Sequence, residues 1–304
     1  MSNKIKILLV ITCCLLFVFT GWLYVDYYSE FKVVFFDIGQ GDSALIRTAA
    51  GEDILIDGGP DKTVLEKLGN ELPFYDRTIE LMVLTHPHAD HVTGLVEVLK
   101  RYKVEKVMLT NVSYNTPAYA EFLNIIRIMH IDQLNPVEVR KIYFTDLTLN
   151  ILYPFQDLTG QEVKDLNDSS VVILAEHEIT KIQNYNNVET RFIASQKTKY
   201  LFTGDIGVGV EQEILERYVV GTGLDPSLKV DVLKVAHQGS TTSSLNEFIQ
   251  AVNPQIAVIS VGENDFGHPS LRVIRRLKRA GAQVLRTDEM GDIKITSDKL
   301  PIKK

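Results

Sequence analysis

The stretch THPHADHVTG, residues 85–94, places three of the seven histidines of the chain and one aspartate within six positions. The apolar run at 79–84 before it predicts a buried strand, and residues 92–100 after it predict a helix. Pro87 fixes one backbone angle and stiffens the turn between them. A strand that ends in such a turn delivers several side chains from one rigid edge. Those side chains are His86, His88, Asp90 and His91.

These four side chains suit divalent cations, because neutral imidazole and carboxylate are ligands for Zn²⁺, Mn²⁺ or Fe²⁺. Ligands this close in the chain can serve two cations side by side, and we expect two divalent ions, zinc or manganese. His86 and His88 would hold one ion. Asp90 and His91 would hold the other.

Two further apolar strands end in candidate ligands. Asp205 follows the run at 200–202, and His237 follows the run at 232–235. We expect Asp205 to bridge the two ions and His237 to complete the second site. Three such junctions in one chain favour metal chemistry, although Asp205 taken alone is equally typical of a turn.

The composition is that of an ordinary globular protein of 304 residues, with a formal charge of −7 and 45% hydrophobic residues. The acidic balance argues against a surface that coats nucleic acid broadly, but it allows a polyanionic substrate to be held locally by metal ions. Both cysteines, Cys13 and Cys14, fall within the apolar N-terminus. Metal ligands after residue 30 are therefore expected among histidine, aspartate, glutamate and asparagine.

The first 29 residues predict a membrane anchor. Lys4 and Lys6 precede the uncharged run 7–25, which approaches the ~20 apolar residues that span a bilayer. Aromatic residues gather at its far end like an interfacial belt; they are Trp22, Tyr24, Tyr27 and Tyr28. We expect a retained single-pass anchor in the cell membrane with the rest of the chain extracytoplasmic, the alternative being a removed signal peptide.

Strands and short helices alternate after the anchor in two halves of similar rhythm. This strand-rich order predicts an α/β fold, a four-layer αββα sandwich, rather than a doubly wound sheet. No linker is visible in this part of the sequence. We therefore expect an anchor at 1–29 and one catalytic domain at 30–304.

Seven motifs in order carry a resemblance to a known family. They are FFDIGQGDSALI (35–46), ILIDGG (54–59), LTHPHADHVTGL (84–95), LNDSSVVILA (166–175), YLFTGDI (200–206), LKVAHQGS (233–240) and NDFGHPS (264–270). Together they resemble the C-terminal hydrolase domain of ComEC competence proteins, which has the metallo-β-lactamase fold, over about residues 31–297. The histidine turn alone would indicate only the superfamily. The polytopic DNA channel of ComEC has no counterpart in the resemblance, and one anchor stands in its place.

The resemblance implies a metal-dependent phosphodiesterase or nuclease that acts on DNA through a metal-activated water. DNA or another phosphodiester polymer would be the substrate, and the membrane would be reached through the N-terminal helix. The same fold implies two alternatives. One is a cell-wall esterase that cleaves teichoic-acid phosphorylcholine, and the other is a catalytically degenerate surface module that only binds.

Two departures from the family concern metal ligands. Many members carry a further histidine before a middle strand, where this chain has Asn167 and Asp168, so the first ion would have a weak or water-mediated ligand there. His177 lies deep in the following strand and is badly placed to substitute. The family motif often reads AHHGS, and Gln238 stands in the second histidine position. We expect His237 to be the ligand and this loss to matter little.

Further residues are candidates for catalysis or support. Asp90 would both ligate an ion and orient the water. His268 would contact a phosphate oxygen or protonate the leaving group, unless it is only a turn histidine. Lys234 would balance substrate charge, unless it is only a strand-face lysine. Asp42 and Asp57 lie on neighbouring turns, and Asp57 would hold the histidine loop by hydrogen bonds.

A helix predicted near the C-terminus, at 271–280, carries five basic residues. Its spacing favours a solvated charged face with Leu271, Ile274 and Leu277 packed inward. The alternative is a local basic patch that steers a polyanion toward the site despite the net negative charge.

Overall fold

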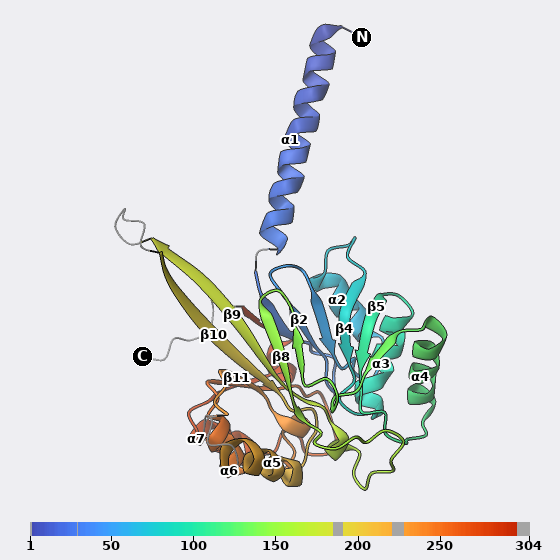
Figure 1. The fold of residues 1–304 in the computed structure, drawn as a ribbon, viewed down its shortest axis with the longest axis vertical. Coiled ribbons are helices and arrows are strands. Elements are labelled where there is room, and N and C mark those ends of the chain that lie inside the picture. Colours follow the sequence, from blue (N-terminus) through green and yellow to red (C-terminus); the bar gives the residue numbers. More distant parts are fainter. Residues whose placement is uncertain (1, 29, 185–190, 221–227, 297–304) are drawn as a thin grey trace.

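Two seven-stranded sheets face one another at the centre of the molecule (Figure 1). The structure is a computed structural model that describes residues 2–28, 30–184, 191–220 and 228–296. The first sheet has the strand order β14-β1-β2-β3-β4-β5-β6, and the second has the order β13-β12-β11-β10-β9-β8-β7. Both sheets mix parallel and antiparallel neighbours.

The strands that the structure describes divide equally between the two sheets. The first sheet contains β1 (Lys32–Phe35), β2 (Ala44–Arg47), β3 (Asp53–Ile56), β4 (Thr78–Val83), β5 (Lys103–Met108), β6 (Asp132–Leu134) and β14 (Ile293–Thr296). The second contains β7 (Lys141–Tyr143), β8 (Leu147–Tyr153), β9 (Val172–Asn184), β10 (Arg191–Phe202), β11 (Val232–Lys234), β12 (Ile256–Ile259) and β13 (Gln283–Arg286).

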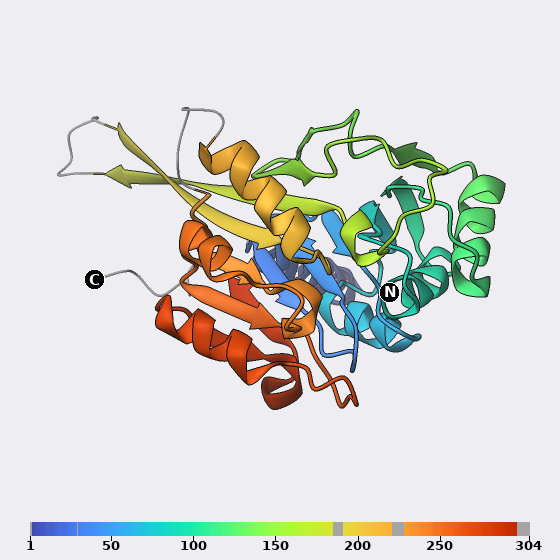
Figure 2. The ribbon, with the colours of Figure 1, turned by 90° about the horizontal axis from the view of Figure 1, so that it is seen from below.

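Helices cover the outer face of each sheet (Figure 2). The first sheet packs against α2 (Thr63–Glu71), α3 (Ala89–Leu99) and α4 (Pro117–Met129). The second sheet packs against α5 (Val208–Leu215), α6 (Asn246–Val252) and α7 (Leu271–Arg279). The remaining segments are α1 (Asn3–Tyr28), α8 (Thr287–Met290) and the short turns η1 (Asn167–Ser169), η2 (Glu216–Val220) and η3 (Ala236–Gly239).

One apolar cluster fills the space between the sheets, and a further cluster lies under each helical layer. Phe35 of β1 and Phe202 of β10 stack across the central space with ring centroids 5.7 Å apart. Successive side chains of β1 alternate between layers, since Val33 and Phe35 join the central cluster whereas Val34 faces the helices. Burial on both faces explains why these strands are continuous apolar runs. The αββα prediction is confirmed.

The helix α1 stands clear of the two sheets (Figure 1). Its stretch Asn3–Gly21 is long and apolar enough to cross a membrane, a test that a signal sequence also passes. The aromatic side chains predicted at 22–28 lie outside the side chains that the structure describes. The division into an anchor and one catalytic domain remains a prediction.

The strands of the first sheet give it two distinct edges. β1 is antiparallel to β2, and β2 is antiparallel to β3, so Lys32 and Asp53 begin their strands at the same edge. β4 runs parallel to β3 and begins there too. The chain passes from α1 into β1 at this edge. The carboxyl ends of β3 and β4 therefore lie at the opposite edge.

His177 of β9 is packed in the interior, as expected for a histidine outside the cluster. Its ring stacks on Phe31 with centroids 3.7 Å apart, and its Nδ1 donates to the carbonyl oxygen of Asp146 at 3.0 Å. Burial lowers the pKa of His177 to about 4. The neutral imidazole is therefore the form that the fold holds.

This burial predicts a pH-dependent stability. The unfolded histidine has a pKa near ~6.5, so the unfolded chain binds the extra proton between about pH 4 and 6.5. The stabilisation is complete above that range and is lost as the pH falls through it. Denaturant titration of the full chain in detergent should show the wild type losing roughly 2–3 kcal/mol relative to His177→Gln between pH 7 and pH 4. A constant difference would contradict the assignment.

Candidate metal centre

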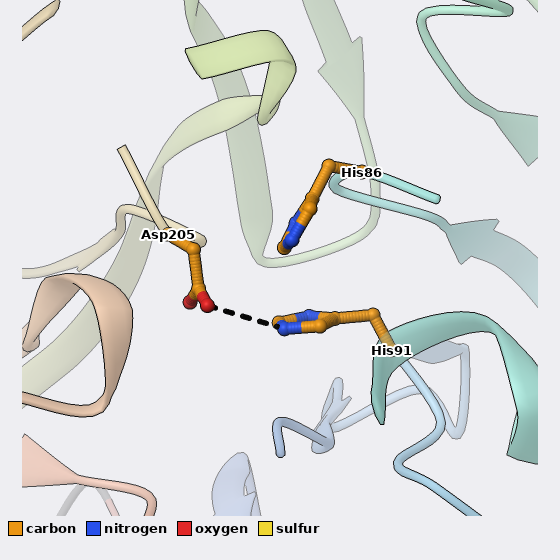
Figure 3. Close-up of side chains that lie close together, drawn as sticks. All are labelled: His86, His91 and Asp205. Carbon is orange, nitrogen blue, oxygen red and sulfur yellow. Dashed lines mark ion pairs between the residues drawn. The ribbon is translucent and has the colours of Figure 1, made fainter. Parts of the chain in front are cut away.

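Side chains from three strand or helix ends meet at the carboxyl edge of the sheets. His86 follows β4, His91 lies in the first turn of α3, and Asp205 follows β10 of the other sheet. One ligand atom of each of these three buried residues lies within 4.8 Å of the others (Figure 3). The meeting point therefore joins the two sheets, as the strand-end ligands predicted.

His86 and His88 present two ring nitrogens to one point. Nε2 of His86 lies 3.0 Å from Nδ1 of His88. The other nitrogen of His86, Nδ1, is contacted by the hydroxyls of Thr85 at 3.2 Å and Ser170 at 3.3 Å. Burial lowers the pKa of His86 well below its usual value, which favours the neutral imidazole that binds cations. The pair is suited to share one ion.

His91 is fixed by a carboxylate on one side and forms ion pairs with two carboxylates on the other (Figure 3). Its Nδ1 lies 2.9 Å from Oδ2 of Asp57. Its Nε2 is buried and makes no hydrogen bond to any residue that the structure describes. Oδ2 of Asp205 lies 3.4 Å and Oδ2 of Asp90 lies 3.7 Å from this nitrogen. A buried nitrogen left without a hydrogen bond between two carboxylates fits a cation-binding position.

The charges around His91 support the same interpretation. Burial by itself would lower the pKa of His91, but the carboxylates of Asp205, Asp57 and Asp90 raise it well above its usual value. Burial would raise the pKa of Asp205, but His91 and Lys234 hold it well below its usual range. The pocket thus concentrates negative charge on ligand oxygens and attracts positive charge to their centre.

Asp57 connects the metal-facing histidine to the strand ends. Its Oδ1 accepts the backbone N–H of Thr85 at 2.8 Å, and its Oδ2 accepts the Thr85 hydroxyl at 2.7 Å. The same Oδ2 contacts His91. These bonds are the ones expected for a residue that holds the histidine loop.

Lys234 of β11 lies beneath Asp205. Its ammonium pairs with Asp42, lies 3.3 Å from the carbonyl oxygen of Gly204, and lies 3.6 Å from Oδ1 of Asp205. Although burial would lower the pKa of Lys234, Asp42 and Asp205 raise it, so the charged form is held. With 4% of its surface exposed, Lys234 is placed to hold Asp205 rather than to meet a substrate. Asp42 is its buried partner, and burial raises the pKa of Asp42 to about 7 although Lys234 acts to lower it.

The turn η3 presents Gln238, not His237, to the carboxylates. Nε2 of Gln238 donates to Oδ2 of Asp90 at 3.1 Å and lies 3.5 Å from Oδ2 of Asp205. Nδ1 of His237 instead lies 3.1 Å from the Thr242 hydroxyl. The expected ligand role of His237 therefore remains a prediction.

His268 lies at the side of the site near His237. The two ring centroids are 5.3 Å apart, and Nδ1 of His268 is buried without a hydrogen bond to any described residue. Burial lowers the pKa of His268, with a further contribution from His237. The position suits a group that faces a substrate, and the donation of a proton by His268 remains a prediction.

The loop at the position of the missing histidine contacts His86 through the hydroxyl of Ser170. Asp168 accepts the backbone N–H of Gly207 at 2.9 Å and so supports the start of α5. The carbonyl oxygen of Asn167 accepts the Ser170 hydroxyl at 2.7 Å. Ser170 also accepts the backbone N–H of Asp205 at 3.1 Å. The loop thus braces His86 and Asp205 through a hydroxyl, whereas weak coordination by Asn167 or Asp168 remains a prediction.

The sequence did not single out every residue that organises the site. Thr85 and Ser170 belong to quoted motifs, but no pattern in them indicates a contact with His86. The need for glycine at position 41 is visible only in the structure. Its φ is +136°, and a Cβ at this position would lie 2.3 Å from the carbonyl oxygen of Asp90. The GQGDS turn therefore lies in close contact with the histidine loop.

Replacing Asp57 tests whether it orients His91. Asp57→Asn keeps the shape but gives the ring an amide in place of a carboxylate. Metal affinity of the full chain, measured by competition with a chromophoric chelator, should fall about 10–100-fold. Circular dichroism serves as the control for folding. Wild-type affinity in this variant would contradict the role of Asp57.

Comparison with known proteins agrees with this geometry. The family model for the metallo-beta-lactamase superfamily matches residues 36–263. ComE operon protein 3 of Bacillus subtilis (strain 168) is 29% identical over 92% of this chain and 35% of its own length. Competence protein ComA of Neisseria gonorrhoeae is 27% identical over 86% of this chain and 32% of its own length. The chain spans about one third of the length of these relatives.

Among solved structures, the metallo-beta-lactamase fold protein YhfI from Bacillus subtilis aligns with a TM-score of 0.48 and 11% sequence identity, over 86% of this chain and 99% of that one. The family match covers well over half of the present sequence and includes the histidine turn and Asp205. The chain therefore belongs to the metallo-beta-lactamase superfamily of hydrolases and is related to competence proteins.

Proposed function

We propose that this protein is a membrane-anchored, metal-dependent phosphodiesterase whose substrate is DNA. The observation that carries the proposal is the convergence of His86, His91 and Asp205 within 4.8 Å, with Nε2 of His91 left without a hydrogen bond to any described residue. Divalent cations bound there would lower the pKa of a water molecule and neutralise charge that develops on a phosphate.

The residues of the chain have separate tasks in this proposal. His86 and His88 would hold one cation, and His91 with Asp90 the other. Lys234 holds one oxygen of Asp205 from below, at 3.6 Å, which leaves Oδ2 turned toward His91. His268 would hold or deliver a proton at the leaving oxygen, since its ring lies at the side of the site, 5.3 Å from the ring of His237.

Nucleic acid is the substrate that the resemblance to ComEC competence proteins implies, and the chain is related to proteins of this kind. The helix α7 adds a local basic surface, with Arg272, Arg275, Lys278 and Arg279 exposed. The inward side of this helix differs from the expectation, since Val273 and Leu277 are buried whereas Leu271 is 67% exposed. The exposed cations would help to attract a phosphodiester polymer to a chain of net negative charge.

The activity is tested with the full chain in detergent micelles and added Mn²⁺ or Zn²⁺. We expect hydrolysis of bis-p-nitrophenyl phosphate and of single-stranded DNA that stops with a chelator. His88→Ala and Asp205→Ala should reduce turnover to the metal-free rate, because each removes a ligand.

His130→Asn is the matched control for these variants. His130 is exposed at the end of α4 with φ +54°, a conformation that asparagine tolerates. This variant should keep wild-type turnover. Activity that survives both the chelator and Asp205→Ala would overturn the proposal. Tight metal binding with no turnover of any phosphodiester would instead support the surface-binding alternative.

The proposed membrane orientation places residues after 30 outside the cytoplasm. Protease added to intact spheroplasts of a producing bacterium should digest this part of the chain, while α1 stays with the membrane. N-terminal sequencing of the membrane fraction should give the first residues of α1. Protection from the protease would contradict the orientation, and a mature protein that starts after α1 would show a removed signal peptide.

A further inference from the structure

Gln238 occupies the position in the metal centre from which a ligand would complete the site of His91. It is 2% exposed, and its amide lies against Oδ2 of Asp90 and Oδ2 of Asp205. These are the two carboxylate oxygens that approach Nε2 of His91. The amide, the two carboxylates and the unbonded ring nitrogen thus surround one point. That point is buried and charged, which favours occupation by a cation over an empty space.

The backbone of η3 explains why the neighbouring histidine is turned elsewhere. His237 and Gln238 both have positive φ, at 49° and 51°, so the chain turns sharply at two successive residues. His237 is half-buried beside Thr242 and His268. Only the second of the two side chains contacts the carboxylates among the described residues.

Gln40 of the GQGDS turn fixes the amide of Gln238. Nε2 of Gln40 donates to Oε1 of Gln238, and Oε1 of Gln40 accepts the backbone N–H of Gly262 at 3.3 Å. A Cβ on Gly262 would lie 2.4 Å from the carbonyl carbon of Gly39, so the two turns are in close contact. Gln40 and Gln238 can both exchange their donor and acceptor ends by a half-turn of the amide. A half-turn of both amides would bring Oε1 of Gln238 to the centre of the site, and it would exchange the 3.3 Å bond from Gly262 to Gln40 for the contact of Oε1 with a cation.

We propose that the side-chain oxygen of Gln238, and not a ring nitrogen of His237, completes this cation site, and that the site consequently prefers Mn²⁺ or Mg²⁺ to Zn²⁺. The inference deepens the proposed function and rests on the cation site that it assumes. With Gln238, the site offers one imidazole nitrogen and three oxygens, from Asp90, Asp205 and the amide. Oxygen ligands suit these harder cations, whereas a second imidazole would favour zinc.

Metal affinity without any measurement of turnover tests the inference. The full chain in detergent micelles is stripped with a chelator, and the dissociation constants of Zn²⁺ and Mn²⁺ are measured by chelator competition and by electron paramagnetic resonance of Mn²⁺. Gln238→His should raise the ratio of Zn²⁺ affinity to Mn²⁺ affinity at least about tenfold. His237→Gln, the matched exchange at the neighbouring position, should leave this ratio within about twofold.

Gln238→Glu guards against a folding defect in the histidine variant, because it keeps an oxygen in a side chain of the same length. It should retain or strengthen the preference for Mn²⁺. An unchanged ratio in Gln238→His, or a large loss of affinity in His237→Gln, would overturn the inference. Failure of the proposed function is distinguishable, since it would appear as selective Mn²⁺ binding without hydrolysis of any phosphodiester.

Discussion

The carboxylate of Asp57 is the contact on which the site depends. It binds the backbone and hydroxyl of Thr85 and the ring of His91, and so joins the end of β3 to the end of β4 and the first turn of α3. Without this contact the buried imidazole would have two unsatisfied nitrogens and no fixed orientation. With it, Nε2 faces the carboxylates of Asp90 and Asp205. A single buried acid thereby fixes the direction in which His91 presents its ligand nitrogen.

Much of this architecture could be predicted from the order of apolar runs. The last three residues of β4 and of β10 are buried and apolar, so each strand ends in a short apolar run followed by a polar turn. That pattern located His86, His91 and Asp205, and the structure brings all three together. It also predicted the layered fold, because short strands and helices alternate in two similar halves. Strands β1–β6 and β7–β13 each build one sheet, and β14 returns to the first.

The choice between His237 and Gln238 could not be predicted in the same way. Both residues lie on one turn, and the positive φ of each decides which side chain faces inward. Residue preference pointed to the histidine, because imidazole is the better-known ligand. The burial of Lys234 could not be predicted either. A lysine on a strand is usually solvated, and its partner Asp42 lies far away in the sequence.

The attachment of α1 to the beginning of β1 has a consequence for what the protein can reach. β1, β3 and β4 begin at the edge where α1 joins, and the far end of β4 leads into the histidine turn. At ~3.3 Å per residue, four to six residues of strand separate the two edges by roughly 13–20 Å. If α1 lies in a bilayer, the histidine turn would lie at the end of the sheet that points away from the lipid headgroups. Under the proposed function, a long polymer in the solvent on that side could reach the metal centre without approaching the lipid. A phospholipid headgroup would be out of reach of the metal centre.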